Sequence, residues 1–185
     1  CDFGSFELSL GGERVVTDTG VYDYTAGARR DWARSTAAHN VAQPDNLEQA
    51  RFWAVHRFAS LVFPRVVRAS YKERNKTFLI RVCSQVFFPI RWRRMFLFRQ
   101  GKLVIADNMN AAFRTLLHFV PGVEATVSSN EKTVFLSGDV VIKASGNVSL
   151  QRNESYHIAG ESRTAWGIRV DGERQTVVEI LRGGI

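Results

Sequence analysis

The segment from residue 18 to residue 40 gathers the side chains best suited to chemistry. It supplies a carboxylate (Asp18), two phenols (Tyr22 and Tyr24), three guanidinium groups and an imidazole (His39). A carboxylate and an imidazole are donors that zinc accepts, although zinc needs three or four N, O or S ligands. Phenol and imidazole groups also transfer protons in catalysis. Because a loop of this length is usually functional, we expect the functional site to include it.

Other chemical motifs are missing from the chain. It has no GxSxG elbow, no GxxxxGK[ST] loop, no HExxH and no GxGxxG. The remaining histidines, His56, His118 and His157, each lie in an apolar strand pattern, which favours a packed or surface role over a functional one. Cys1 and Cys83 form neither a disulfide framework nor a CxxC metal motif.

The charge balance favours an acidic partner. The chain has 25 Lys and Arg against 18 Asp and Glu, a net charge of +7 and a pI of about 9.9. Nucleic acid, an anionic lipid surface and an anionic polysaccharide all suit this charge, as does a basic surface that serves solubility alone. No RNA-binding aromatic motif or zinc finger is present, so we expect no nucleic acid partner. No apolar run approaches the ~20 residues of a membrane span.

Polar and apolar residues alternate along most of the chain, with turn residues between the alternating stretches. This pattern predicts strands. Four turns are expected at Gly11-Gly12, Gln100-Gly101, Gly138-Asp139 and Asp171-Gly172, joining residues 5–10 to 14–17, 92–99 to 102–106, 134–137 to 140–143, and 164–170 to 176–181. Strands recurring every ~8–12 residues are typical of a sandwich or a barrel. We predict an all-β fold, an antiparallel two-sheet β-sandwich, over residues 1–185. Its inward side chains are expected to be Phe6, Leu8, Leu10, Trp166 and Ile168.

Two segments look able to form helical turns, residues 28–36 and residues 45–51. The first is short and carries three arginines, so we predict an ordered loop there. The first strand begins almost at residue 1, and chain ends usually carry some slack. We therefore expect the chain to be a fragment of a longer protein.

Three motifs follow one another near the start of the chain. Residues 5–8 read S-F-E-L, residues 18–22 read D-T-G-V-Y, and residues 34–40 read R-S-T-A-A-H-N. Their order resembles the C-terminal β domain of heparinase II/III-like polysaccharide lyases, and residues 116–124 resemble the strand that opens the second half of that domain. The family's His-Ala-His-x-Asp stretch would lie immediately before Cys1-Asp2, and residues 46–58 match the family only loosely. The family's N-terminal helical α/α-toroid domain is absent from this sequence.

The resemblance implies a lyase that cleaves an acidic polysaccharide beside a uronic acid by β-elimination. It leaves heparan sulfate, alginate and bacterial surface polysaccharides open as substrates, and it favours a periplasmic or secreted protein although no signal peptide opens the chain. It also implies a structural zinc ion with Asp18 and His39 as ligands and a third ligand, a histidine, just before Cys1. The fragment alone is expected to be inactive without the helical domain.

Residue roles follow from the same resemblance. Tyr24 is the first choice for a phenol facing the substrate cleft, and Tyr22 is the other candidate. Arg34 and Asn40 are expected to contact a substrate carboxylate or sulfate, although Arg34 could equally hold the loop to a backbone carbonyl. The alternative function is a non-catalytic domain that binds or scaffolds an anionic glycan.

Overall fold

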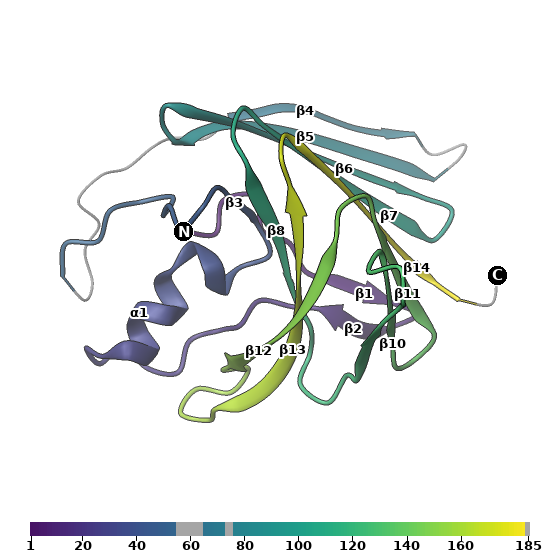
Figure 1. Cartoon of the computed structure of the whole chain (residues 1–185). Helices are drawn as coiled ribbons and strands as arrows, with labels where there is room; N and C mark the ends of the chain where they lie inside the picture. The colour runs from purple at the N-terminus through teal and green to yellow at the C-terminus, as the bar shows by residue number, and fades with distance from the viewer. Residues whose placement is uncertain (55–64, 73–75, 184–185) are drawn as a thin grey trace.

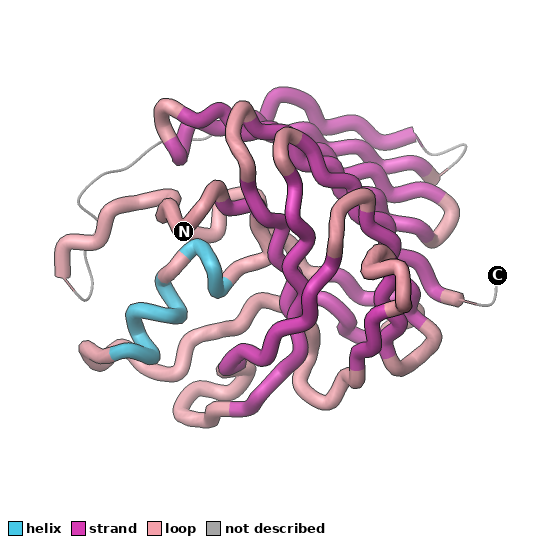
Figure 2. The backbone as a smooth tube through the Cα atoms, in the orientation of Figure 1, coloured by secondary structure: helices cyan, strands magenta, loops and turns pink. Residues whose placement is uncertain are grey.

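The computed structural model describes residues 1–54, 65–72 and 76–183, with backbone alone for residues 65–72 (Figure 1). Strands dominate the described residues (Figure 2). The elements are β1 (Leu8–Leu10), β2 (Glu13–Val16), α1 (Ala28–Arg34), the 3-10 helix η1 (Thr36–Ala38), β3 (Ala42–Gln43), β4 (Arg65–Lys72), β5 (Thr77–Phe87), β6 (Ile90–Arg99), β7 (Lys102–Met109), β8 (Phe113–His118), β9 (Ala125–Val127), β10 (Thr133–Leu136), β11 (Val140–Ala144), β12 (Val148–Ser155), β13 (Arg163–Gly172) and β14 (Gln175–Arg182). None of the helices described is long and apolar enough to cross a membrane.

Two antiparallel sheets form a sandwich, as the sequence predicts. The large sheet has the strand order β4-β5-β6-β7-β14-β11-β10-β9, and the small sheet has the order β12-β13-β8-β3. A separate hairpin of β1 and β2 lies beside them (Figure 1). The N-terminus lies on the side of α1, and the chain leaves β14 on the opposite side of the domain (Figure 1).

The main hydrophobic core lies between the two sheets. Ile105 and Ile142 of the large sheet and Leu117 and Ile168 of the small sheet are almost completely buried there. Of the five residues predicted to face inward, Leu10 and Ile168 are buried in this core, while Phe6, Leu8 and Trp166 pack against it. A second cluster around Trp92 joins β5, β6 and β7 to the segment that carries β3.

Three predicted hairpins are confirmed. They are β1 with β2, β6 with β7, and β10 with β11. At the turns, Gln100, Gly101, Gly138 and Asp139 have positive φ angles of 52°, 73°, 78° and 59°. Such backbone angles at both central residues define the type I′ turn that suits a two-residue hairpin.

The fourth predicted hairpin is wrong. β13 and β14 follow one another at Asp171-Gly172, but β13 belongs to the small sheet and β14 to the large sheet, where it pairs with β7 and β11. Neither Asp171 nor Gly172 has a positive φ angle. The chain therefore crosses from the small sheet to the large sheet between β13 and β14. Residues of β14 then pair with β7 on one side and β11 on the other.

The helix predictions also need correction. Residues 28–36, expected to be a loop, contain α1 and the start of η1, whereas residues 45–51 contain no helix. Asp31 in the first turn and Arg34 in the last turn suit the helix dipole. A helix of 7 residues is unstable alone. Its packing is what stabilises it, since Ala33 is buried and the ring of Trp32 meets that of His118 edge to face.

Candidate functional site

Asp18 and His39 are in direct contact on the outer side of the small sheet. The Nδ1 atom of His39 lies 2.6 Å from Oδ2 of Asp18, and the other carboxylate oxygen accepts the Gly20 N–H at 3.0 Å. Burial acts to raise the pKa of Asp18. The hydrogen bond and charge of His39, together with the Gly20 N–H, lower this pKa by a larger amount, so the net pKa is below the ordinary value. The proximity expected for these two residues is therefore met, while their role as metal ligands stays a prediction.

The position of Asp18 is set by the end of β2. The Thr17 N–H donates to the carbonyl of His118 at 3.0 Å, and Val16 forms a β-bridge with Phe119. This attaches the start of the 18–40 segment to the end of β8. After α1 and η1 the chain returns to Asp18 at His39, which is only 8% exposed. Two residues that are 21 positions apart thus meet through the backbone around them.

Asn40 is fully buried and connects three parts of the backbone. Its side-chain N–H groups donate to the carbonyls of Phe6 and Thr17, each at 2.9 Å, and its Oδ1 accepts the His118 N–H at 2.7 Å. The Asn40 side chain has no exposed surface for a ligand. The geometry shows that Asn40, next to His39 in the chain, joins these three backbone segments, and the predicted contact with substrate stays a prediction.

A buried ion pair that sequence reasoning missed supports Asn40 from the large sheet. Arg94 donates to both carboxylate oxygens of Asp107, from Nε at 2.7 Å and from Nη2 at 2.8 Å. Its Nη1 donates to the carbonyls of Gly4 and Asn40 at 2.8 and 2.6 Å. The signal was present in the sequence, because neighbouring residues of a strand face opposite ways. Of the adjacent Arg93 and Arg94, one had to point into the protein.

His118 borders the Asp18–His39 pair from β8 and is completely buried. Its Nε2–H donates to the carbonyl of Ala37 at 3.0 Å, and its Nδ1 accepts from the side-chain amide of Asn153 at 3.3 Å. Burial lowers the pKa of His118 to about 4. Both ring nitrogens are used by a neutral imidazole, which agrees with the packed role expected for this histidine. His157 is exposed, and His56 lies outside the described residues.

His118 is expected to make the domain less stable as the pH falls from 6.5 to about 4. In that range the unfolded chain binds a proton that the folded chain does not, so protonation favours unfolding. The difference between 6.5 and about 4 corresponds to about 3 kcal/mol. We expect urea unfolding to show that His118→Gln loses about 3 kcal/mol less stability than the unmodified chain between pH 7 and pH 4. Identical losses in the two proteins would contradict this account.

The two candidate phenols differ in exposure. Tyr22 is half-buried, with its ring edge to face on Tyr156 at 5.6 Å and the guanidinium of Arg29 over it at 4.3 Å. Tyr24 is 67% exposed, with the guanidinium of Arg30 at 4.8 Å from its ring centre. A ligand approaching from solvent therefore has freer access to the hydroxyl of Tyr24.

Tyr156 is held by a neighbouring carboxylate. Its hydroxyl donates to Glu154, whose carboxylate also lies 3.9 Å from Arg29. Burial first, and then this carboxylate, raise the pKa of Tyr156 above its ordinary value. The arrangement keeps Tyr156 protonated and supports the ring of Tyr22.

Arg34 points away from these groups. It is 6% exposed, donates to the carbonyl of Ala54 at 2.7 Å and lies over the ring of Phe52 at 4.5 Å. Of the two roles considered for Arg34, the structure shows the one in which it holds the loop to a backbone carbonyl. A substrate contact stays a prediction.

The predicted site residues therefore fall into separate places. Asp18 and His39 touch, while Asn40 beside them points inward, the two phenols lie with their own arginines, and Arg34 faces residues 52–54. Within the described part of the chain, no three His, Cys, Asp or Glu side chains form a group that could hold a metal ion. Asp18 and His39 are chemically suitable zinc donors, but they are two of the three or four that zinc requires.

A comparison with protein families decides where the chain belongs. The model of the heparinase II/III-like C-terminal domain matches residues 1–182. The chain belongs to the heparinase II/III-like C-terminal family. This confirms the resemblance seen in the three N-terminal motifs, and it covers the second half of the chain as well. The sequence matches no curated protein.

Solved structures show the same fold as this heparinase II/III-like domain. A heparinase III gene product superposes with a TM-score of 0.80 at 15% identity, over 97% of this chain and 30% of its own. Another heparinase III gives 0.78 at 18% identity, over 98% and 29%. The heparan sulfate lyase HepC from Pedobacter heparinus gives 0.76 at 15% identity, over 97% and 30%. This chain thus spans about 30% of the length of these proteins.

Proposed function

We propose that this domain is part of a polysaccharide lyase that cleaves a uronic-acid-containing chain by β-elimination. The observation that carries the proposal is the family match over residues 1–182. Solved proteins with the same fold bear the names heparinase III and heparan sulfate lyase. The net charge of +7 suits a polyanionic substrate.

The reaction sets three demands on a protein. The uronate carboxylate must be neutralised, so that the proton on C5 becomes acidic. A base removes that proton, the C4–O4 bond breaks as a double bond forms between C4 and C5, and an acid protonates the leaving O4. This chain offers the exposed phenol of Tyr24 and the half-buried phenol of Tyr22 for proton transfer, each beside an arginine.

The 185-residue chain by itself is expected to show no lyase activity. Tyr24 is exposed and Tyr22 half-buried, whereas elimination needs a site that excludes water and fixes the sugar against the catalytic groups. The measurement is the rise in ultraviolet absorbance of the unsaturated uronate product, on several uronate polymers. The complete protein that contains this domain should give the signal. An absorbance signal from the 185-residue chain would contradict the expectation that this domain needs the rest of the protein for catalysis. The absence of a signal from the complete protein would favour the non-catalytic glycan-binding alternative.

We further propose that Asp18 and His39 hold a zinc ion together with a donor from outside this chain. The supporting geometry is their direct contact and the position of the Cys1 amino group, close enough for the charge of Asp18 to act on it. A residue preceding Cys1 in a longer chain would start from this place. Bound there, zinc would join the two ends of the 18–40 segment, Asp18 just after β2 and His39 just after η1, and keep that surface rigid.

Zinc binding to the 185-residue chain is expected to be weak, with a Kd above about 1 μM, because only two donors are present. Competition with a chromophoric chelator measures the affinity without any activity assay. His39→Ala should raise the Kd at least about tenfold, whereas Asp139→Asn, which removes an exposed carboxylate in the turn between β10 and β11, should leave it unchanged. Equal affinities in the two variants would rule out the Asp18–His39 site.

A further inference from the structure

Two arginines lie beside one another on the outer face of the small sheet. Thr115 points inward, because its hydroxyl donates to Asp107 of the large sheet at 2.8 Å. Its neighbour Arg114 therefore points outward. Arg169 of β13 is paired with Leu116, two positions along β8 from Arg114. The two arginines are thus diagonal neighbours on one face, where long side chains can meet.

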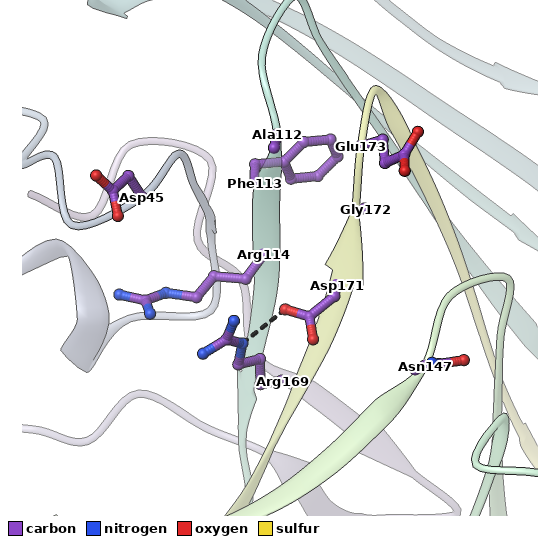
Figure 3. Close-up of a pocket in the computed structure, with 9 residues that line it drawn as sticks. All are labelled: Asp45, Ala112, Phe113, Arg114, Asn147, Arg169, Asp171, Gly172 and Glu173. Carbon is purple, nitrogen blue, oxygen red and sulfur yellow. Dashed lines mark hydrogen bonds and ion pairs between the residues drawn. The ribbon is translucent and has the colours of Figure 1, made fainter.

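A cavity of about 610 Å³ opens beside these guanidinium groups. Figure 3 shows them close together, with Asp45 on one side and Asp171 on the other. Glu173 lies farther along the rim (Figure 3). The volume is within the range of small-molecule binding sites.

No carboxylate of the described residues forms an ion pair with Arg114, and Asp45, Asp171 and Glu48 act on its charge only from farther away. Its Nη2 donates instead to two neutral amide oxygens, Oε1 of Gln43 at 3.0 Å and Oδ1 of Asn46 at 2.5 Å. Its Nε is shielded from solvent and has no hydrogen-bond partner among these residues. Burial and then the charge of Arg169 lower the pKa of Arg114, which shows that the two cations repel one another.

The positive charge of Arg169 is only partly compensated by a carboxylate. Its Nε donates to Oδ1 of Asp171 at 2.7 Å, in a pair that is half exposed to solvent. This contact leaves the terminal nitrogens of Arg169 for a further acceptor. An oxyanion placed between the two guanidinium groups would relieve their repulsion and accept several charge-assisted hydrogen bonds.

We propose that Arg114 and Arg169 form a subsite for a single oxyanion, a carboxylate or a sulfate, carried by a sugar of the polysaccharide. That the oxyanion belongs to a sugar rests on the proposed function. Asp45, Asp171 and Glu173 around the cavity can accept hydrogen bonds from sugar hydroxyls, and they repel additional anions. The subsite therefore suits a sparsely charged sugar better than a densely sulfated one.

The subsite lies on the same strand as His118, the histidine that borders the Asp18–His39 pair. Arg114 and His118 share the outer face of β8, and four residues of a strand span about 13 Å. His118 borders the Asp18–His39 pair, since its ring bonds to Ala37. Leu116 and His118 are each 2% exposed, so protein covers the outer face of β8 between the two places, and a polysaccharide that contacted both would have to pass over this cover.

Binding to the full 185-residue chain tests the subsite by calorimetry at moderate salt. The probes are an unsulfated oligogalacturonate, a carboxylate-free sulfated dextran oligosaccharide and sodium sulfate. Arg169→Gln and Arg114→Gln should each weaken binding about tenfold or more, as expected for a lost charge-assisted hydrogen bond. The matched control is Arg163→Gln, on the same strand and also paired with an acid two residues away, Glu161 at 3.2 Å. It should change affinity less than about twofold, since general charge is lowered equally in all three variants.

The probes identify the group that is bound. A preference for oligogalacturonate assigns a carboxylate, and a preference for the sulfated probe or free sulfate assigns a sulfate. Equal weakening in Arg163→Gln, or no binding of any probe to the folded chain, would overturn the subsite. Arg169→Lys keeps the positive charge but lacks the two parallel N–H donors of a guanidinium, so this variant should also bind the probes more weakly. It tests the subsite if Arg114→Gln fails to fold. The lyase proposal has its own test, the product absorbance of the complete protein. If the complete protein gave no product on any uronate polymer while the 185-residue chain still bound through these arginines, the lyase proposal would be refuted and the subsite would stand.

Discussion

Asp107→Asn is expected to lower the free energy of unfolding by about 3–5 kcal/mol, the usual effect of removing one partner from a buried ion pair. The Arg94 and Asp107 side chains are 0% and 1% exposed, so the remaining guanidinium has no water to replace the carboxylate. Asp107 also accepts hydrogen bonds from Trp92 at 2.9 Å and Thr115 at 2.8 Å. Chemical denaturation followed by circular dichroism measures the change.

The matched control for this substitution is Glu179→Gln. Glu179 pairs with Lys102 at 3.3 Å between the neighbouring strands β7 and β14, but both side chains are partly exposed. Its loss should change stability by less than about 1 kcal/mol, as for most surface ion pairs. If Asp107→Asn were as mild as this control, the Arg94–Asp107 pair would not be what joins Gly4 and Asn40 to the large sheet.

Under the proposed lyase function, Tyr24→Phe is expected to lower the turnover of the complete protein by about 10²–10⁴-fold, the range for loss of a general acid or base. The reason is exposure, because the hydroxyl of Tyr24 is open to a ligand while its ring is supported by Arg30. Substrate binding should change little, since the phenyl ring remains. The rate of increase in product absorbance at saturating substrate measures turnover, and its concentration dependence gives KM.

Tyr22→Phe is the comparison that makes this prediction specific. The ring of Tyr22 packs against Tyr156 and Arg29, and phenylalanine keeps that packing. We expect a loss of less than about tenfold in this variant. A large loss in Tyr22→Phe with little in Tyr24→Phe would exchange the two roles. Full activity in both variants would place the catalytic phenol outside this chain.

The family assignment depends on residues that were visible in the sequence. The order of three short motifs indicated the family, and the family match over residues 1–182 confirmed it. The same motifs suggested that Asp18 and His39 act together, and their side chains are in contact. Residue type alone did not show which neighbours would be turned inward, and Asn40 and Arg34 proved to be buried.

Local features of the fold were predictable because they depend on neighbours in the chain. Alternation of polar and apolar residues indicates which strand face is buried, and a pair of residues with positive φ, such as Gly138-Asp139, closes a hairpin without help from elsewhere. Leu10 and Ile168 were placed correctly in the core for this reason. The α1 helix was missed because its stability comes from tertiary contacts of Trp32 rather than from its own propensity.

The sequence by itself determined the class of fold, three hairpins and the family, since each is written in short stretches of residue types. Only the tertiary structure decided that β13 and β14 belong to different sheets, that Arg94 is buried against Asp107, and that Arg114 and Arg169 share one surface. Each of these depends on which strands become neighbours. That choice is made by burial of the whole core and by pairing of backbone groups far apart in the chain, and no local pattern encodes it.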